Sequence, residues 1–187
     1  MSDAAVPKRP ATYADVLDQP EHVVAEIVGG TLDLGPLPPP RGALAKTALC
    51  ALLANALCEG RGQDRGWWVM PSPELRLGDD VLVADIAAWR CAHAPDLLDR
   101  DRFDVAPDWV CEVLQPKTRA LDLAVKRPAY ARHGVAHLWQ VDPDARTLEA
   151  FALEGGRWVL VDTLTDAAEV ALPPFDAVAF ALADLWA

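Results

Sequence analysis

The chain has 187 residues with a formal net charge of −11, and 52% of its residues are hydrophobic. This length predicts one domain, residues 1–187, with enough residues to bury a substantial core. The negative charge argues against a protein that coats nucleic acid, because binding of that kind depends on neutralising phosphates. The chain opens without an apolar leader, and its most apolar stretch, Ala48 to Cys58, is too short to span a bilayer. We therefore expect a soluble, cytoplasmic protein that does not engage membranes.

The cysteines and histidines do not have the spacing of a zinc site or a disulfide framework. Cys50 and Cys58 lie eight residues apart on a predicted helix, so we expect them to share a face and pack in the core. His133 and His137 are separated by Gly134, which interrupts any helix that would bring them together. We interpret both as structural or surface histidines.

Basic residues gather in one segment of this acidic chain. Between Lys117 and His133 there are five Lys or Arg residues and one acid, Asp122, whereas residues 142–187 hold nine acids and two arginines. A local basic segment can guide a phosphate to one site. A solvated helix face has the same composition, and charge alone does not separate these two interpretations.

The first predicted elements are a short helix, a β-hairpin and a long helix. Thr12 followed by Asp15 is typical of a helix N-cap, and Pro20 ends that helix. Gly29-Gly30 forms the hairpin turn, and an Ala- and Leu-rich run predicts a helix that ends at Gly60. The expected ranges are 22–28 and 31–34 for the hairpin strands, 36–40 for a Pro-rich loop and 43–59 for the long helix.

The rest of the chain is predicted as strands with two further helices. The strands are expected at 66–70, 74–77, 81–89, 109–114, 137–141, 147–153 and 157–163, and the helices within 121–132 and at 176–186. This order predicts an α/β fold with one mixed central sheet flanked by helices. The seven tryptophans fall mostly on strands, and we expect them to pack in the core.

Two acidic residues interrupt apolar strand patterns. Glu112 lies between Val110 and Leu114 on one face of its predicted strand, and Asp85 interrupts the apolar run 81–89. Burying such a carboxylate is unfavourable unless it is paired or binds a metal. For one acid alone, a strand-end cap or an arginine partner is the simpler explanation. Two such acids on neighbouring strands would form an oxygen-rich site that suits Mg²⁺.

Lys126 follows these acids on the predicted helix within 121–132. Asp122 precedes it by four residues, so an ordinary salt bridge on the helix surface is one interpretation. The other directs Lys126 at the metal site, where it would stabilise charge on a phosphate or orient the attacking water. Pro128 disfavours the α conformation at Arg127, which predicts a kink there or a regular helix that begins only at Pro128.

The segment PDWVCEVLQPKTRALDLAVKRPAYARHGVAHLWQVDP, residues 107–143, resembles the signature of the Uma-two family of "putative restriction endonucleases". That family is assigned to the PD-(D/E)xK nuclease superfamily. The segments AEIVGGTLDLGPLPPP, PSPELRLGDDVLVADIAAWR and PPFDAVAFALADLW extend the resemblance over nearly the whole chain. The resemblance implies a restriction-endonuclease-like core with an N-terminal hairpin, Mg²⁺ or Mn²⁺ as cofactor, and DNA as substrate.

The resemblance also implies which residues form the site. Asp85 matches the acid of the family's "PD" strand, with Ala84 in place of the proline, and Glu112 matches the acid of the E-V-L-S-P-S-T motif. These two acids are the implied metal ligands. Leu114 stands where a plain ExK motif has its lysine, and the resemblance supplies that lysine from the next helix as Lys126.

Three further residues match motif positions. Glu26 matches an acid of the E-I-V-x-G hairpin and is expected to support the metal site; it also lies between Val24 and Val28 on one strand face, an unusual place for a charge. Asp122 and Tyr130 match positions to which the resemblance gives no firm role.

Two departures bear on activity. The family commonly has a histidine after the Pro-rich loop, where this chain has residues 41–43, Arg-Gly-Ala, and Gln115 and Lys117 replace the motif's serines. The leading hypothesis is therefore a metal-dependent endonuclease that hydrolyses DNA. The alternative is a catalytically degenerate nuclease fold that acts as a binding or assembly module. A small-molecule or nucleotide hydrolase using the same site is a third, and a homodimer is a further expectation.

Overall fold

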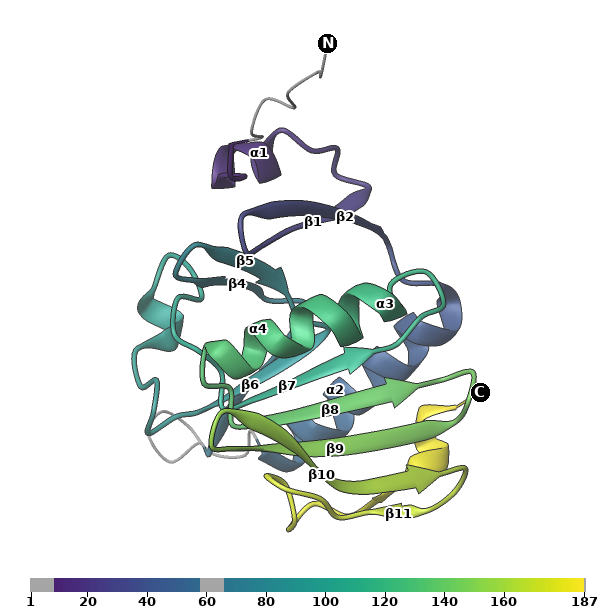
Figure 1. Ribbon diagram of the computed structural model, residues 1–187. Coiled ribbons are helices and arrows are strands. Elements are labelled where there is room, and N and C mark those ends of the chain that lie inside the picture. The colour runs from purple at the N-terminus through teal and green to yellow at the C-terminus, as the bar shows by residue number, and fades with distance from the viewer. Residues whose placement is uncertain (1–8, 58–65, 187) are drawn as a thin grey trace.

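A computed structural model describes residues 9–57 and 66–186, and Cys58 and Gly60 lie outside them. The described chain forms a four-stranded, a six-stranded and a two-stranded sheet with helices around them (Figure 1). The elements are α1 (Tyr13–Leu17), β1 (Val23–Val28), β2 (Thr31–Pro36), α2 (Pro40–Leu57), β3 (Trp67–Pro71), β4 (Glu74–Leu77), β5 (Asp80–Val83), β6 (Ile86–Arg90), η2 (Leu97–Asp99), β7 (Trp109–Val113), α3 (Arg119–Leu121), η3 (Asp122–Lys126), α4 (Arg127–Arg132), β8 (His137–Asp142), β9 (Thr147–Glu154), β10 (Arg157–Thr165), β11 (Glu169–Val170), β12 (Phe180–Ala181) and η4 (Leu182–Leu185).

The N-terminal helix and hairpin form as predicted. Thr12 is the N-cap of α1, and its backbone N–H donates to the Asp15 carboxylate at 2.7 Å. Gly29 and Gly30 have φ values of 57° and 76°, the left-handed conformation that a tight hairpin turn requires. The hairpin closes between Val28 and Thr31, and β2 runs on to the first residue of the expected Pro-rich loop.

The mixed central sheet is present as predicted, and a second main sheet, which includes the hairpin, accompanies it. The four-stranded sheet has the order β2-β1-β5-β4 and is antiparallel throughout. The six-stranded sheet has the order β10-β9-β8-β7-β6-β3 and is mixed, because β7 and β8 are parallel. The predicted strand 81–89 is two strands, because the chain leaves the first sheet after Val83 and joins the second at Ile86.

Helices cover both faces of the six-stranded sheet, as predicted (Figure 1). On one face, Leu49 and Leu53 of α2 pack in a core that includes Trp109 and Trp139. On the other face, Tyr130 of α4 packs in a second core cluster that includes Val110 and Leu138. Alternation along β7 divides its side chains between these two clusters and directs Glu112 to the α3–α4 face. No described helix has both the length and the apolar character to cross a membrane.

The helix within 119–132 is continuous, and its irregularity is a π turn, η3. Arg127 keeps the α conformation with φ −57° and ψ −47°, so the prediction that a regular helix begins only at Pro128 is wrong. The ring of Pro128 would clash with the carbonyl four residues earlier in a regular helix, and a widened turn relieves that clash. The π turn carries Asp122 and Lys126, both of which are buried.

The predicted C-terminal helix at 176–186 is wrong. Phe180–Ala181 pairs with Glu169–Val170 as a short antiparallel ladder, and a 3₁₀ turn follows at Leu182–Leu185. Phe180, Leu182 and Leu185 are buried in the core on the α2 side. The alternating burial of Phe180 and Leu182 suits an extended segment, and that packing outweighs the helix propensity of the Ala- and Leu-rich sequence.

Candidate functional site

The candidate site is a cavity of about 220 Å³ between the N-terminal hairpin and the six-stranded sheet. The hairpin, α2, the crossing between β5 and β6, the end of β7 and the α3–η3 helix all contribute to its wall. Four carboxylates and two lysines line it, namely Glu26, Asp85, Glu112, Asp122, Lys46 and Lys126. All four residues that the sequence pointed to, Asp85, Glu112, Lys126 and Glu26, therefore lie around one cavity.

Glu112 lies on β7 at the centre of the sheet and is only 2% exposed. Its Oε1 accepts a hydrogen bond of 2.5 Å from the Tyr130 hydroxyl and lies 2.9 Å from the Lys126 ammonium. Burial raises the pKa of Glu112 well above its ordinary value, and the opposing effect of Lys126 is smaller. Both of these contacts engage Oε1, and no hydrogen bond or ion pair to Oε2 is found among the described residues.

Lys126 extends from the π turn into a ring of oxygen atoms. Its Nζ donates to the Val83 carbonyl at 2.8 Å and lies 3.2 Å from Glu26 Oε1 and 3.8 Å from Asp122 Oδ1, in addition to Glu112. Burial alone lowers the pKa of Lys126, but the negative charges of Glu112, Glu26 and Asp122 outweigh it and raise the pKa above the ordinary value. Lys126 is therefore a buried, charged residue that holds the acids together.

Glu26 connects the hairpin to the site. It is buried on β1, and its Oε1 accepts a hydrogen bond of 2.7 Å from the backbone N–H of Val83. The Val83 carbonyl is bound by Lys126, so two side chains of the site satisfy the backbone at the end of β5. This contact fixes the point at which the chain leaves one sheet for the other.

Asp85 lies between β5 and β6 and not within a strand, which corrects the prediction of two strand-borne acids. Its Oδ2 accepts a hydrogen bond of 2.8 Å from the backbone N–H of Val113, the residue after Glu112. Its Oδ1 lies 3.2 Å from the ammonium of Lys46. The bond to Val113 therefore ties Asp85 to the end of the strand that carries Glu112.

Asp122, whose role the sequence left open, is buried on the π turn. Its Oδ2 accepts a hydrogen bond of 3.0 Å from the Thr118 hydroxyl. Burial raises the pKa of Asp122 to about 6, although Lys126 and Thr118 act in the opposite direction. The salt bridge expected between Asp122 and Lys126 exists at 3.8 Å, but it lies inside the cavity and not on the helix surface.

Lys46 is a site residue that the sequence reasoning missed. Its side chain extends from α2 into the cavity. The ammonium donates a hydrogen bond to Ser72 Oγ at 3.0 Å and forms an ion pair with Asp85. A signal was present, because Lys46 is the one charged residue in the otherwise uncharged run 43–58. Gly42 lies one turn before Lys46, in the segment that has no histidine. It packs against Gln115, and a Cβ added at Gly42 would lie 3.5 Å from Gln115 Nε2.

The chemistry of the donor set fits a hard divalent cation. Asp85 and Glu112 line the same cavity, and Mg²⁺ commonly takes one or two carboxylates and leaves its other positions to water and phosphate oxygen. The wall also holds more carboxylates than ammonium groups, an imbalance that a cation would offset. Within residues 9–57 and 66–186, no three His, Cys, Asp or Glu side chains form a metal-binding group.

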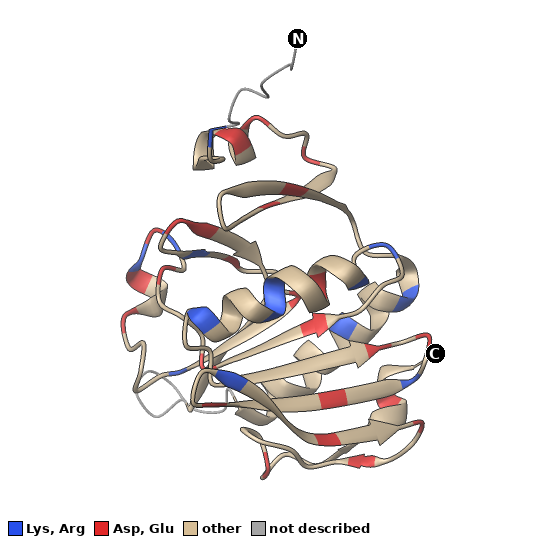
Figure 2. Cartoon of the chain, in the orientation of Figure 1, with Lys and Arg blue, Asp and Glu red and all other residues tan. Residues whose placement is uncertain are grey.

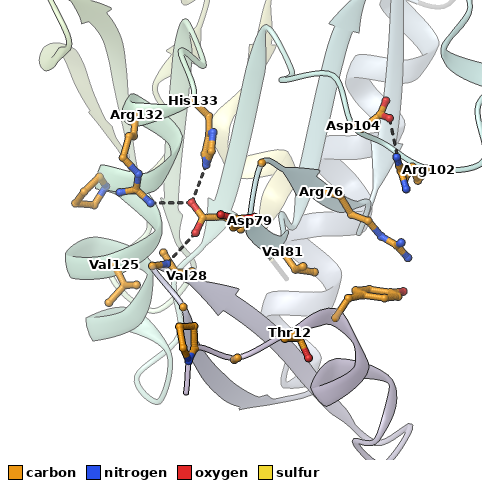
Figure 3. Close-up of a pocket in the computed structure, with 18 of the residues that line it drawn as sticks. Thr12, Val28, Arg76, Asp79, Val81, Arg102, Asp104, Val125, Arg132 and His133 are labelled. Carbon is orange, nitrogen blue, oxygen red and sulfur yellow. Dashed lines mark hydrogen bonds and ion pairs between the residues drawn. The ribbon is translucent and has the colours of Figure 1, made fainter. Parts of the chain in front are cut away.

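A larger cavity of about 1390 Å³ lies at the other end of the hairpin, by the Gly29-Gly30 turn (Figure 3). There the Asp80 carboxylate accepts hydrogen bonds from the backbone N–H of Gly29 and from Arg132, and it contacts His133 Nε2 at 2.7 Å. The arginines and aspartates of this wall are equal in number, so its charges are matched. His133 has a structural partner, as the sequence suggested, and this cavity holds none of the expected site residues.

The basic segment is largely neutralised by acids from elsewhere in the fold. Arg119 pairs with Asp142 and Arg132 with Asp80, while Lys126 is inside the site. In Figure 2 basic positions recur along the α3–α4 helix, whereas the lower strands carry mainly acidic ones. The segment is therefore neither a purely solvated face nor an unpaired basic patch.

Comparisons with known proteins agree with this architecture. A crystal structure of "a putative nuclease belonging to DUF820" from Anabaena variabilis ATCC 29413 is similar with a TM-score of 0.75 and 21% identity, over 94% of this chain and 97% of that one. No curated protein matches the chain. The model of the Uma2 family, described as "Putative restriction endonuclease", matches residues 10–183. The chain therefore belongs to the Uma2 family, and it has the α/β nuclease fold that its sequence predicted.

Proposed function

We propose that the protein is a metal-dependent endonuclease that hydrolyses phosphodiester bonds in DNA. The observation that carries the proposal is the placement of Asp85, Glu112 and Lys126 around one cavity. Membership of a family described as "Putative restriction endonuclease" supports the same class of reaction. In the reaction, a water oxygen bonds to phosphorus, the P–O bond to one neighbouring nucleotide breaks, and the departing oxygen takes up a proton.

Asp85 and Glu112 are the proposed ligands of Mg²⁺ or Mn²⁺. When bound, that cation would lower the pKa of a coordinated water and neutralise charge on the phosphate. Asp85 is held toward the site by the N–H of Val113, and Glu112 by the hydroxyl of Tyr130. Both carboxylates are therefore oriented before substrate arrives, which is the condition for efficient catalysis.

Lys126 and Glu26 form the floor of the proposed site. The ammonium of Lys126 lies between Glu112 and Glu26, so it keeps these two side chains close together. Its charge would also favour the additional negative charge of the transition state. Glu26 fixes the backbone of Val83 and thereby the chain that leads to Asp85.

The proposal is tested by calorimetry with MgCl₂ and MnCl₂ together with cleavage of supercoiled plasmid. The parent is compared with Asp85→Asn and Glu112→Gln, and with Asp162→Asn as a control, because Asp162 is exposed on β10. We expect binding of one cation and cleavage by the parent and the control, and loss of both in the two site variants. Cleavage that survives both site substitutions would refute the assignment.

The second candidate is a nuclease fold that binds DNA or a partner without cleaving. The observation that favours it is the segment 41–43, Arg-Gly-Ala, which has no histidine where the family commonly has one. In that case the parent would bind metal and a DNA duplex in the same assays, and the plasmid would remain intact at every metal concentration.

A further inference from the structure

We propose that Lys46, and not Lys126, is the lysine that contacts the scissile phosphate, and that Lys126 is a positioning residue. This proposal rests on the proposed function and specifies which lysine contacts the substrate. It assigns a role to a residue that neither the sequence pattern nor the family resemblance identified.

The surroundings of Lys126 leave little room for a substrate contact. An ammonium group has three protons, and three oxygen atoms of the protein already lie within 3.2 Å of Nζ, on Val83, Glu112 and Glu26. Its side chain is 4% exposed. Donation to a phosphate would require Lys126 to give up one of these contacts and leave a buried carboxylate or carbonyl unpaired, which is unfavourable.

Lys46 has the opposite properties. Two oxygen atoms of the described chain lie within 3.2 Å of its Nζ, on Ser72 and Asp85, so one proton is available for a ligand. Its side chain is 17% exposed and lines the cavity. The ammonium lies beside Asp85, one of the two proposed metal ligands, so Lys46 would supply a positive charge next to that carboxylate when a phosphate enters the cavity.

The backbone at Ser72 supports a built contact. Ser72 has φ 51°, a left-handed conformation that is uncommon for a residue other than glycine. In this conformation its N–H donates to the Asp85 carbonyl at 2.9 Å, while its hydroxyl accepts from Lys46. Such local strain persists where the surrounding structure enforces it, and it is concentrated at functional sites. Ser72 thus holds both Asp85 and Lys46.

The position of Lys46 on α2 also suits this role. Gly42 and Lys46 are four residues apart, so they share one face of the helix. That face meets the site, because Gly42 packs against Gln115 and Lys46 pairs with Asp85. With no side chain at Gly42, the ammonium of Lys46 is the group through which α2 presents positive charge to the cavity.

The test uses Lys46→Met, Lys46→Arg and, as a control with the same change of charge, Arg157→Met. Arg157 is an exposed residue of β10 and does not line the cavity. Single-turnover cleavage of a DNA duplex in MgCl₂ is measured for each variant, and Mg²⁺ affinity is measured separately by calorimetry. Binding of the same duplex is titrated in CaCl₂ at several salt concentrations, a readout that does not depend on cleavage.

We expect Lys46→Met to lower the cleavage rate about 100-fold, the usual effect of removing one donor to the transition state. Lys46→Arg should recover part of that loss, Arg157→Met should stay within about threefold of the parent, and Mg²⁺ affinity should be equal or higher in Lys46→Met. The proposal is overturned if Lys46→Met cleaves at the parental rate, or if it loses Mg²⁺ binding as Asp85→Asn does.

Failure of the proposed function gives a different result. If the parent binds the duplex but does not cleave it, endonuclease activity is refuted, and the binding titration alone decides the role of Lys46. Lys46→Met should then weaken duplex binding and reduce the slope of log affinity against log salt by about one, as expected for one lost phosphate contact. Parental affinity and slope would overturn the phosphate contact as well.

Discussion

The Tyr130 hydroxyl donates a hydrogen bond of 2.5 Å to Glu112 Oε1, and neither residue is open to solvent. This contact joins α4 to the central strand β7 at the point where the carboxylate needs support. Burial raises the pKa of both groups, so Tyr130 stays protonated and serves as a permanent donor to Glu112. The role that the sequence left open for Tyr130 is therefore to orient the glutamate.

Replacement of Tyr130 by phenylalanine removes that donor and leaves the ring in place. We expect the variant to lose about 1–3 kcal/mol of unfolding free energy, because a buried acceptor loses its partner. The pKa of Glu112 should rise further, which weakens Mg²⁺ binding most at low pH because a ligand carboxylate must be deprotonated. Urea denaturation and calorimetry between pH 6 and 8 measure both effects.

The chain provides its own control for this variant. Tyr13 lies on α1 outside the site, stacked with the Arg76 guanidinium 3.5 Å from the ring centre. Its hydroxyl hydrogen-bonds Glu74 at a partly exposed position, so Tyr13→Phe should change stability by about 1 kcal/mol or less. If Tyr130→Phe matched this control in stability and in Mg²⁺ affinity, the hydrogen bond would have no orienting role.

Replacement of Lys126 by methionine should destabilise the metal-free protein by about 3–5 kcal/mol, because Glu112 and Glu26 would remain buried without a countercharge. The reference is Lys117→Met, which removes an exposed lysine and should change stability by less than about 0.5 kcal/mol. Urea midpoints of the two variants give the comparison. Equal midpoints would mean that solvent reaches the acids and that Lys126 is not their main partner.

Asp122 should make the free energy of unfolding fall as the pH rises. Its pKa is about 6 in the folded protein and 3.8 in an unperturbed chain, so the folded state binds this proton more tightly. Asp122 therefore contributes stability that is complete below about pH 3.8 and is lost as the pH rises through about 6. Relative to Asp122→Asn, the parent should lose on the order of 3 kcal/mol between pH 4 and 7.

Asp162→Asn, at an exposed position of β10, is measured alongside as the reference for replacing an aspartate outside the site. Saturating Mg²⁺ should reduce the loss at pH 7, since a cation in the cavity offsets the charge that Asp122 acquires. A parent and an Asp122→Asn variant with parallel stability curves from pH 4 to 7 would contradict the buried environment assigned to Asp122.

The sequence predicted those parts of the site that leave a local signal. Glu112 stood out because a charge interrupted an alternating apolar strand, and the unfavourable burial of a lone carboxylate made that position unusual. Asp85 stood out for the same reason, but the apolar residues on either side concealed the crossing between two sheets. The direction of Lys126 followed from the resemblance alone, and the π turn that resolves the difficulty of Pro128 has no single-residue signature.

Other features depended on contacts between distant residues. The pairing of Lys46 with Asp85 joins α2 to the crossing between the two main sheets. Lysine is a good helix former, so its presence in a helical sequence does not by itself indicate this contact. The prediction of a C-terminal helix was wrong for the opposite reason. The Ala and Leu content of the segment favoured a helix, whereas Phe180 and Leu182 pack in the core as part of an extended segment. In both cases tertiary packing decided an outcome that local preference could not.

Gln140 supports a prediction about stability. It is paired with Glu112 in the parallel register of β7 and β8, and it is 1% exposed. Within the described part of the chain, its side-chain Nε2 and Oε1 are buried without a hydrogen-bond partner. Gln140→Leu keeps a similar volume and removes two unsatisfied polar atoms, so we expect it to raise the unfolding free energy by about 1–3 kcal/mol in urea denaturation.

Gln140→Glu is the matched contrast, because it keeps the shape and adds a negative charge beside Glu112. That variant should be destabilised by several kcal/mol at pH 7 and recover as the pH falls, since the new buried carboxylate must take up a proton. If Gln140→Leu were instead destabilised, the amide would have to be satisfied by an internal water.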